Sequence, residues 1–292
     1  MRKYYGEFGL LITAIIWGSG FVATSLALTY YTPYQTMAIR FLVGGIILAL
    51  VFYKRLKSIT ATLLLKGAFL GTILYISFAL QTVGLQFTTP SKNAFITAVN
   101  VVIVPIIAFV FYRKRLNISE AVGAVLALVG IGFMSLQISG TINFGDFLTF
   151  LCAIGFAFHI IYTAQFVKGE DPIQLTVIQL LTAALIGIVI IGTRGELAIP
   201  FELNALIPVI YLGLFSTTIA YLLQTAGQKL VTETKAAIIL STEALWGTIF
   251  SVIILNEIIT LRMTIGAICI LVAILLSELN LNLSSRISRQ QT

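Results

Sequence analysis

Apolar residues form ten long runs along the chain, separated by clusters of charged residues, proline or glycine. A hydrocarbon core about 30 Å thick needs roughly 20 apolar residues per helix, and each run is close to that length. The pattern therefore predicts an all-α integral membrane protein with ten transmembrane helices. The predicted helices cover about residues 7–26, 33–53, 66–86, 93–112, 119–137, 145–166, 172–192, 204–226, 236–255 and 261–280.

The second half of the chain repeats short patterns of the first half. At an offset of 139 residues, and later of 143, the matches are Gly6 with Gly145, Glu7 with Asp146, Pro33 with Pro172, Gln35 with Gln174, Arg40 with Gln179, Gln81 with Gln224, Gly84 with Gly227, Lys92 with Lys235 and Gly123 with Gly266. Each copy contains five predicted helices, and an odd number of crossings turns the second copy upside down in the membrane. Inverted repeats are typical of secondary transporters. We expect one repeat at residues 1–140, a second at 141–283 and a short cytoplasmic tail at 284–292.

The composition also requires a lipid solvent. Hydrophobic residues make up 59% of the chain and charged residues 10%, against about 25% charged residues in soluble domains. A net charge of +7 would suggest a nucleic-acid partner in a soluble protein. Here the basic residues fall in the predicted loops, and we expect no nucleic-acid partner. Both cysteines lie within apolar runs, so no disulfide is expected.

Lys and Arg are distributed unequally between the two predicted sides of the membrane. Fourteen lie on the side of the N-terminus, and three lie on the other side, namely Lys92, Arg194 and Arg262. Cytoplasmic loops carry the excess of basic residues. The sequence therefore predicts a multi-pass protein of the cell inner (plasma) membrane with both termini in the cytoplasm.

Two local patterns suggest other readings. Arg2, Lys3 and the apolar run after them have the form of a signal peptide, but residues 145–166 repeat this segment, and we expect an uncleaved helix. Residues 18–23 fit the dinucleotide pattern G-x-G-x-x-A, yet they lie inside a predicted membrane span without a preceding strand. We therefore expect no nucleotide, and no other bound cofactor.

Two charged residues lie deep within predicted spans. A charge at the middle of the membrane costs about 2.5–3.5 kcal/mol on insertion scales, so such residues are candidates for function. The depths of Arg40 and Glu243 would allow their side chains to pair in one conformation and separate in another. The alternative is a structural role, as a permanent ion pair or with Arg40 bound to carbonyl groups. For Glu243 we favour binding of a cation or a proton, which makes it the candidate for proton coupling.

Other polar and aromatic residues fall at helical spacing in several predicted spans. Together with the two charges, the predicted substrate-binding and translocation residues are Trp17, Arg40, Gln81, Asn93, Asn100, His159, Tyr162, Tyr221, Gln224, Glu243 and Trp246. Such stripes would form a cavity with aromatic walls and a few hydrogen-bonding groups. The alternative is hydrogen bonding between helices, and for His159 we expect a satisfied buried histidine. With one histidine, no multi-histidine metal site is possible within one chain.

The chain resembles the EamA-type ten-helix members of the drug/metabolite transporter superfamily. The resemblance covers essentially the whole chain and is carried by Trp17-Gly18, Arg40, Ser91 to Phe95, Pro105, Gly123-Ala124, Glu243, Asn256-Glu257 and Gly266-Ala267. It implies two inverted five-helix repeats around a central cavity, with the fifth and tenth helices at the periphery. Two departures are Ala244, where the family often has proline, and Lys114, at the position that Glu257 takes in the second repeat.

These observations predict a secondary active transporter. It would export small metabolites such as amino acids by alternating access, coupled to protons or to exchange. The alternative is efflux of lipophilic cations, selected by aromatic walls and Glu243. An enzyme is not expected, because the chain has no H-E-x-x-H or G-x-S-x-G motif, and a channel is disfavoured because no charged ring or filter repeat is present. The expected partners are a small-molecule substrate and membrane lipid, with the protein a monomer or homodimer.

Overall fold

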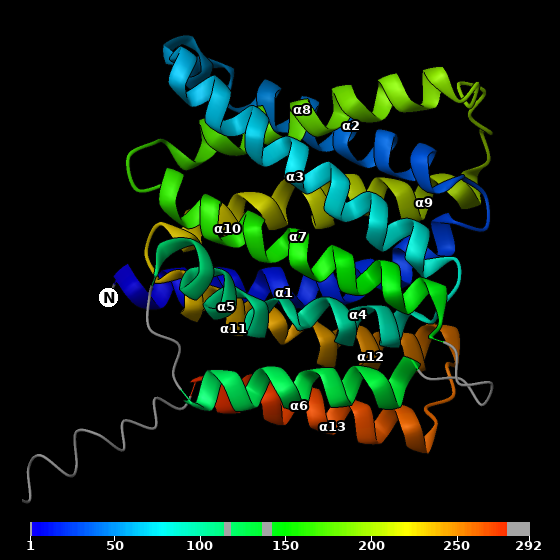
Figure 1. The fold of residues 1–292 in the computed structure, drawn as a ribbon. Coiled ribbons are helices and arrows are strands. Elements are labelled where there is room, and N and C mark those ends of the chain that lie inside the picture. The colour runs from blue at the N-terminus through cyan, green and yellow to red at the C-terminus, as the bar shows by residue number, and fades with distance from the viewer. Residues whose placement is uncertain (1, 114–117, 136–141, 279–292) are drawn as a thin grey trace, which may run out of the picture.

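The computed structural model describes residues 2–113, 118–135 and 142–278, and these residues form helices without any β-strand. Lys114 and the predicted tail at 284–292 lie outside this part of the chain. The long helices cross the molecule from one side to the other, at different tilts, as Figure 1 shows. The prediction of an all-helical protein is confirmed.

The helices of the first half are α1 (Arg2–Ala27), α2 (Pro33–Val51), the 3₁₀ helix η1 (Tyr53–Ser58), α3 (Ala61–Leu85), α4 (Pro90–Ala98), α5 (Asn100–Tyr112) and α6 (Ile118–Ser135). Those of the second half are α7 (Phe144–Phe166), α8 (Pro172–Thr193), α9 (Leu203–Tyr211), the π-helix η2 (Leu212–Ile219), α10 (Ala220–Gln228), α11 (Glu233–Ser241), α12 (Glu243–Leu255) and α13 (Leu261–Glu278).

Eight helical stretches in the described residues are long and apolar enough to cross a membrane, which confirms a multi-pass membrane protein. They are Tyr4–Ala27, Pro33–Val51, Ala61–Leu85, Pro90–Phe111, Phe144–Phe166, Pro172–Thr193, Leu203–Gln228 and Lys235–Leu255. Two shorter apolar stretches, Ala121–Ser135 and Leu261–Leu276, coincide with the fifth and tenth predicted spans.

Threonine and proline mark where several helices begin. The side chains of Thr32, Thr60, Thr89 and Thr232 each accept a hydrogen bond from the backbone N–H three residues later. Proline is the first residue of α2, α4 and α8, where its missing N–H costs no hydrogen bond. These local signals fix the helix starts at the loops and leave the apolar interiors for packing.

The two halves also break their helices at equivalent positions. Val99 interrupts the helix between α4 and α5, and Thr242, 143 residues later, interrupts it between α11 and α12. The same offset relates Arg113 and Asn256, which end α5 and α12 in the left-handed region with φ of 53° at both residues. The fourth and ninth predicted spans are thus each built from two helices joined at a break.

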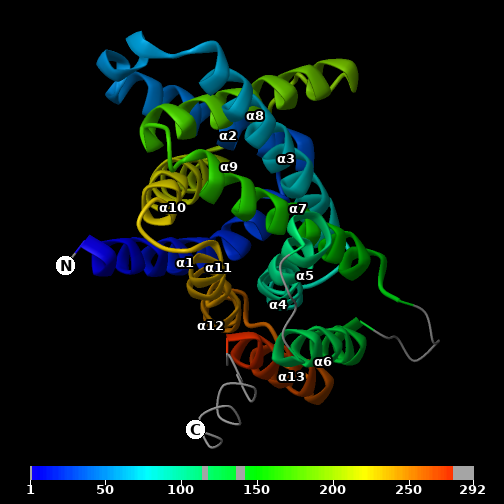
Figure 2. The same ribbon diagram turned by 60° about the vertical axis from the view of Figure 1, so that its left-hand side comes forward.

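The loops gather at the two ends of the bundle. We call the end that carries Lys54, Arg55, Lys66, Lys229 and Lys235 the basic end; it also holds the N-terminus (Figure 1). The loops after α1, α3, α8 and α12 lie at the opposite end. Figure 2 shows α6 and α13 side by side at one edge of the bundle. This edge position agrees with the peripheral place expected for the fifth and tenth helices.

Glycines allow close contact between helices of different halves. At the basic end, a Cβ on Gly227 would lie 3.0 Å from the Gly6 carbonyl oxygen. At the opposite end, a Cβ on Gly145 would lie 2.4 Å from the Gly84 carbonyl oxygen. The repeat offsets relate Gly6 to Gly145 and Gly84 to Gly227. Equivalent glycine contacts therefore occur at both ends of the bundle.

Replacing Gly18 with alanine should destabilise the protein. A Cβ at this position in α1 would lie 2.4 Å from the Cβ of Trp246 and 2.8 Å from the backbone nitrogen of Gly247 in α12. Overpacking of this kind costs about 1–3 kcal/mol. We expect a lower midpoint of thermal unfolding in detergent. Gly192→Ala in α8 is the control, since nothing lies within 4 Å of its added Cβ; equal midpoints for both variants would contradict the α1–α12 contact.

Candidate functional site

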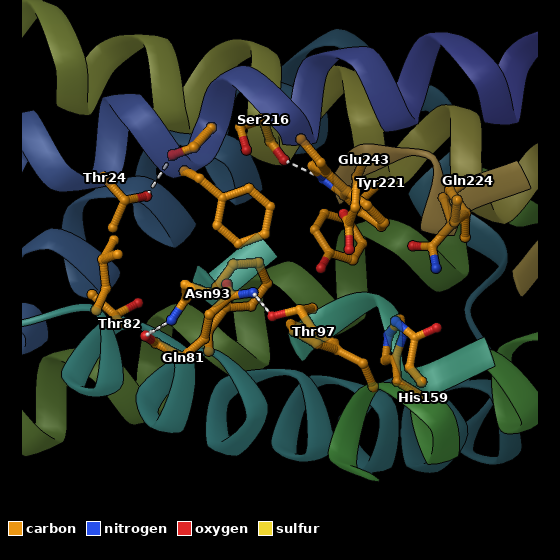
Figure 3. A pocket seen from close by; sticks show the side chains of 18 of the residues that line it. Thr24, Gln81, Thr82, Asn93, Thr97, His159, Ser216, Tyr221, Gln224 and Glu243 are labelled. Carbon is orange, nitrogen blue, oxygen red and sulfur yellow. Dashed lines mark hydrogen bonds between the residues drawn. The ribbon is translucent and has the colours of Figure 1, made fainter. Parts of the chain in front are cut away.

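A cavity lies between helices of both halves and brings together most of the residues singled out in the sequence. Nine of the predicted site residues line it: Trp17, Arg40, Gln81, Asn93, Asn100, His159, Tyr221, Gln224 and Glu243. They come from α1, α2, α3, α4, α5, α7, α10 and α12, so that no single segment forms the site. Figure 3 shows several of these polar side chains pointing into one space.

The cavity has a volume of about 610 Å³, part of it open to the outside.

The remaining lining residues are Gly20, Phe21, Thr24, Phe78, Thr82, Leu85, Thr97, Phe156, Ile160, Ser216 and Leu240. Helical spacing in the sequence predicts two of them, because Phe21 shares a face with Trp17 and Thr97 shares a face with Asn93. Phe78 precedes Gln81 by one turn and could have been found in the same way. Ser216 lies in the π-helix η2, whose wider turn changes which residues share a face. No sequence signal identified it.

Two predicted site residues do not line this cavity. Tyr162 lies in a separate groove between α3 and α7, where its ring centroid is 5.0 Å from that of Phe69. Trp246 lies at the contact of α12 with α1, next to Gly18, and its ring centroid is 6.4 Å from that of Phe250. Tyr162 follows the cavity residue His159 by three positions, and Trp246 follows Glu243 by three positions. In both helices the side chain one turn further along lies beyond the edge of the cavity.

Arg40 is a buried cation whose protein partners are neutral. Its side chain is 2% exposed. Its Nε donates to the Thr217 hydroxyl at 3.0 Å, and its Nη2 donates to the Ser216 hydroxyl at 3.0 Å. The guanidinium carbon lies 4.3 Å from the centroid of the Phe78 ring, a cation–π contact. From the sequence, backbone carbonyl groups are one expected partner of Arg40. In the structure its hydrogen-bond acceptors are these two hydroxyl groups instead.

Glu243 is the acidic residue of the cavity. It is 5% exposed and is the first residue of α12, directly after the break at Thr242. Within the described residues its carboxylate forms no hydrogen bond, and no ion pair within 4.0 Å joins it to Arg40. Asn100 is the equivalent residue of the first half, and it likewise begins a helix after a break. The two charges therefore lie on one cavity without neutralising each other directly.

A network of amides and hydroxyls supports one wall of the cavity. Gln81 Nε2 donates to the Thr97 hydroxyl at 3.1 Å, and Asn93 Nδ2 donates to the Thr149 hydroxyl at 2.8 Å. The buried side-chain oxygens of Asn93, Asn100 and Gln224 have no hydrogen-bond partner in the described part of the chain. The amide nitrogens of Gln81 and Asn93 therefore serve as structural hydrogen-bond donors, whereas these three oxygens remain available to a solute.

His159 is hydrogen-bonded within the protein. Its Nε2 lies 2.9 Å from Gln179 Oε1, and Gln179 Nε2 donates to the Thr225 hydroxyl at 3.4 Å. This arrangement is the one expected of a satisfied buried histidine. Among the residues that the structure describes, no three His, Cys, Asp or Glu side chains lie together as a metal site would require.

Aromatic rings form much of the apolar wall. Trp17 and Tyr221 have centroids 5.0 Å apart, and Phe78 lies 5.2 Å from Phe156 and 6.2 Å from Tyr221. Trp17 is fixed further by a hydrogen bond of 3.0 Å from its Nε1 to the Ser216 carbonyl oxygen. The cavity thus combines rigid aromatic surfaces with a small number of polar groups, as small-molecule sites do.

Ion pairs join the halves at both ends of the helix bundle. At the basic end, Lys235 of α11 pairs with Glu7 of α1. At the opposite end, Lys92 Nζ of α4 lies 3.8 Å from Asp146 Oδ2 of α7. The repeat offsets relate Lys92 to Lys235 and Glu7 to Asp146, and each lysine occupies the third position of a helix capped by threonine. We call these contacts the two equivalent ion pairs.

Further hydrogen bonds connect the loops at each end of the bundle. At the basic end, Lys66 Nζ donates to Glu170 Oε1 at 2.6 Å, and Lys229 Nζ donates to the Glu170 carbonyl oxygen at 2.8 Å. At the opposite end, the Thr32 hydroxyl donates to Glu196 Oε2 at 2.5 Å, and this hydrogen bond lowers the pKa of the Glu196 carboxyl, with Arg194 acting in the same direction. The ionised Glu196 carboxylate therefore stabilises the folded protein. This stabilisation is complete above the pKa of a free glutamate and is lost as the pH falls through the lower pKa that Glu196 has in the folded state.

Comparison with known proteins agrees with this picture. The model of the EamA-like transporter family matches residues 4–136 and again residues 143–279. An uncharacterized transporter of Archaeoglobus fulgidus is 31% identical over 282 residues, which cover 96% of this chain and 87% of that protein. The uncharacterized transporter YdfC of Bacillus subtilis is 22% identical over 285 residues, covering 93% and 90% of the two chains. A crystal structure of another protein has a similar fold, with a TM-score of 0.71 at 16% identity over 95% of this chain and 97% of the other. The chain belongs to the EamA-like transporter family.

Proposed function

We propose that this transporter exports small polar metabolites, such as amino acids, by alternating access. The observation that carries the proposal is the pair of equivalent ion pairs, Glu7–Lys235 and Asp146–Lys92, at the two ends of the helix bundle. Each joins an element of one half to an element of the other half. Opening either end requires its own ion pair to separate while the other stays closed, which is the behaviour of an alternating-access carrier.

The repeat organisation follows from the same contacts. Residues 1–140 and 141–283 form two five-helix units of opposite orientation in this proposal. Equivalent residues then meet at opposite ends of the bundle, as the glycine contacts Gly6–Gly227 and Gly84–Gly145 do. The two successive matches to the family model support the same division. With both ends held by equivalent contacts, the two halves can rock about the central cavity.

The basic end faces the cytoplasm in this proposal, and the protein lies in the plasma membrane. Lys54, Arg55, Lys57, Lys66, Lys229 and Lys235 lie at this end, whereas Lys92, Arg194 and Arg262 lie at the other. An excess of basic residues marks cytoplasmic loops. Both termini are then cytoplasmic, because the chain enters at this end and crosses an even number of times.

Glu243 supplies the coupling. It carries a carboxylate at the position where the first half has Asn100, so this ionisable group has no equivalent in the other repeat. A buried carboxylate without a protein partner can take up a proton in one conformation and release it in another as its surroundings change. Glu243 lies in the first turn of α12, where the helix dipole favours negative charge.

A second candidate function is efflux of lipophilic cations. The observation in its favour is the combination of the unpaired Glu243 with the aromatic wall of Trp17, Phe78, Phe156 and Tyr221. Aromatic faces attract cations by about 0.5–2 kcal/mol, more when the site is dry. Arg40 argues against this candidate, because its positive charge lies on the same cavity.

Purified protein in liposomes distinguishes the two candidates. We expect counterflow of labelled L-leucine against unlabelled amino acids, and no counterflow of tetraphenylphosphonium. Transport of tetraphenylphosphonium alone would favour efflux of lipophilic cations. Saturation with rising solute concentration separates a carrier from a channel. Absence of counterflow for a broad panel of amino acids, organic acids, amines and lipophilic cations would contradict transport by this cavity.

The two ion pairs should bias the protein in opposite directions. Lys235→Gln should favour opening of the basic end and Lys92→Gln opening of the opposite end, because each removes one ion pair. Partly exposed pairs contribute about 0.2–1 kcal/mol, so the shift should be severalfold at most. The measurement is the rate at which a membrane-impermeant thiol reagent modifies a cysteine placed at Thr24, added from each side, in a background without Cys152 and Cys269.

Each variant is the matched control of the other, because both remove an equivalent lysine. Lys235→Gln should raise the modification rate only from the basic side, and Lys92→Gln only from the opposite side. A rise from the same side in both variants would contradict two equivalent closures.

Glu243→Gln should flatten the pH dependence of transport. The amide keeps the size of the side chain but neither binds nor releases a proton. Counterflow of L-leucine, measured between pH 5.5 and 8.5, should vary less with pH than in the wild type. Asn100→Gln is the control at the equivalent position. A folded Glu243→Gln variant with the wild-type pH profile would show that another group couples transport to protons.

A further inference from the structure

Arg40 has more hydrogen-bond donors than the protein uses. A guanidinium has five N–H groups, and Nε and Nη2 each make one hydrogen bond, to Thr217 and Ser216. Within the described residues Nη1 donates to no protein atom, and no carboxylate oxygen lies within 4.0 Å of this guanidinium. Three N–H groups of a residue that lines the cavity are therefore free to bind another group.

Among the described residues, the buried positive charge of Arg40 has no carboxylate partner within 4.0 Å. Buried charges in proteins are normally paired, because an unpaired one costs several kcal/mol. Glu243 lines the same cavity but does not contact Arg40. A negative group entering the cavity would therefore gain both the missing charge partner and hydrogen-bond donors at Arg40.

The guanidinium is held by a specialised segment. Ser216 and Thr217 are consecutive residues of η2, an eight-residue π-helix, a form often found at functional sites. A Cβ on Gly20 of α1 would lie 2.8 Å from the Ser216 hydroxyl oxygen, and a Cβ on Gly44 of α2 would lie 2.8 Å from the Thr217 methyl carbon. The two hydroxyls are thus fixed against α1 and α2, and so is the guanidinium that binds them.

The equivalent segment of the first half has none of these features. At the offset of 143 residues, Ser216 and Thr217 correspond to Ile73 and Leu74, which lie within the regular helix α3. Arg40 itself corresponds to Gln179. Apolar residues in a regular helix therefore suffice for packing at this position in the fold. The arginine of the first half and the hydroxyls and π-helix of the second half meet at one place, and the equivalent positions, Gln179 with Ile73 and Leu74, have none of these features. This difference indicates a chemical role for the cluster.

We propose that Arg40 binds a carboxylate group of the transported solute, with Ser216 and Thr217 as its positioning residues. A carboxylate matches the planar fork of a guanidinium and can accept two parallel hydrogen bonds from it. A single negative charge suits the cavity better than a doubly charged phosphate, because Arg40 is the one arginine or lysine among the described residues that line it. This proposal rests on the proposed transport function, and it adds the chemical class of one group on the solute.

Matched carboxylates and amides test the proposal directly. The probes are 4-methylpentanoate with 4-methylpentanamide, and L-leucine with L-leucinamide, at constant ionic strength and pH 7. The measurement is the thermal stabilisation of the full-length protein in detergent at increasing probe concentration. We expect at least one carboxylate to stabilise the wild type more than its amide, and Arg40→Gln to abolish that difference.

Variants in η2 keep the test valid if Arg40→Gln fails to fold. Ser216→Ala and Thr217→Val leave the arginine in place but remove its supports. Hydrogen bonds to charged groups contribute about 1.5–3 kcal/mol, so each variant should weaken carboxylate binding about tenfold to a hundredfold. Thr218→Val is the control, because the Thr218 hydroxyl donates to the carbonyl oxygens of Gly213 and Gly44 instead of contacting Arg40.

Three results would overturn the proposal: equal stabilisation by a carboxylate and its amide, a carboxylate preference that survives in Arg40→Gln, or no stabilisation by any carboxylate. Liposome counterflow separates these results from failure of transport itself. A wild-type protein that transports amines or neutral solutes without binding carboxylates would retain the transport function and exclude the role proposed for Arg40.

Discussion

The hydrocarbon core of a membrane offers no hydrogen-bond partners, and this constraint decides where the few polar side chains of the chain can lie. Every polar group within a span has to face another part of the protein or a cavity. Gln179 meets His159, and Arg40 meets the hydroxyls of η2. Glu243 and the side-chain oxygens of Asn93, Asn100 and Gln224, which have no hydrogen-bond partner among the described residues, lie on the cavity wall. The cavity therefore offers polar groups that the packing of the helices leaves free.

The same constraint explains how much of the fold could be predicted from the sequence. A membrane helix must be continuous and apolar for about 20 residues, so its position follows directly from the composition of the run. The predicted span at residues 172–192 differs from α8 (Pro172–Thr193) by one residue. Nine of the predicted site residues line the cavity because a polar residue in such a run has few other places to lie.

Other features depend on contacts between distant segments. Tyr162 and Trp246 share a helical face with cavity residues, yet neighbouring helices decide where the cavity ends, and both lie beyond it. The π-helix changes the register of α10 relative to α9, so Ser216 cannot be assigned to a face by counting residues. The pairing of Lys235 with Glu7 spans 228 residues. The repeat offsets relate Lys92 to Lys235, but the acidic partner of each lysine follows only from the three-dimensional structure.

The two halves have similar residues at their packing contacts and different residues at the cavity. Glycine contacts, helix breaks and ion pairs recur at equivalent positions of the two halves. At the cavity the equivalent residues differ: Arg40 corresponds to Gln179, and Glu243 corresponds to Asn100. If the halves are inverted repeats, as we propose, a lining with the same symmetry would bind a solute equally well in two opposite orientations. One arginine and one glutamate on different helices remove that degeneracy, so the proposed site would hold a solute with a carboxylate in a single orientation.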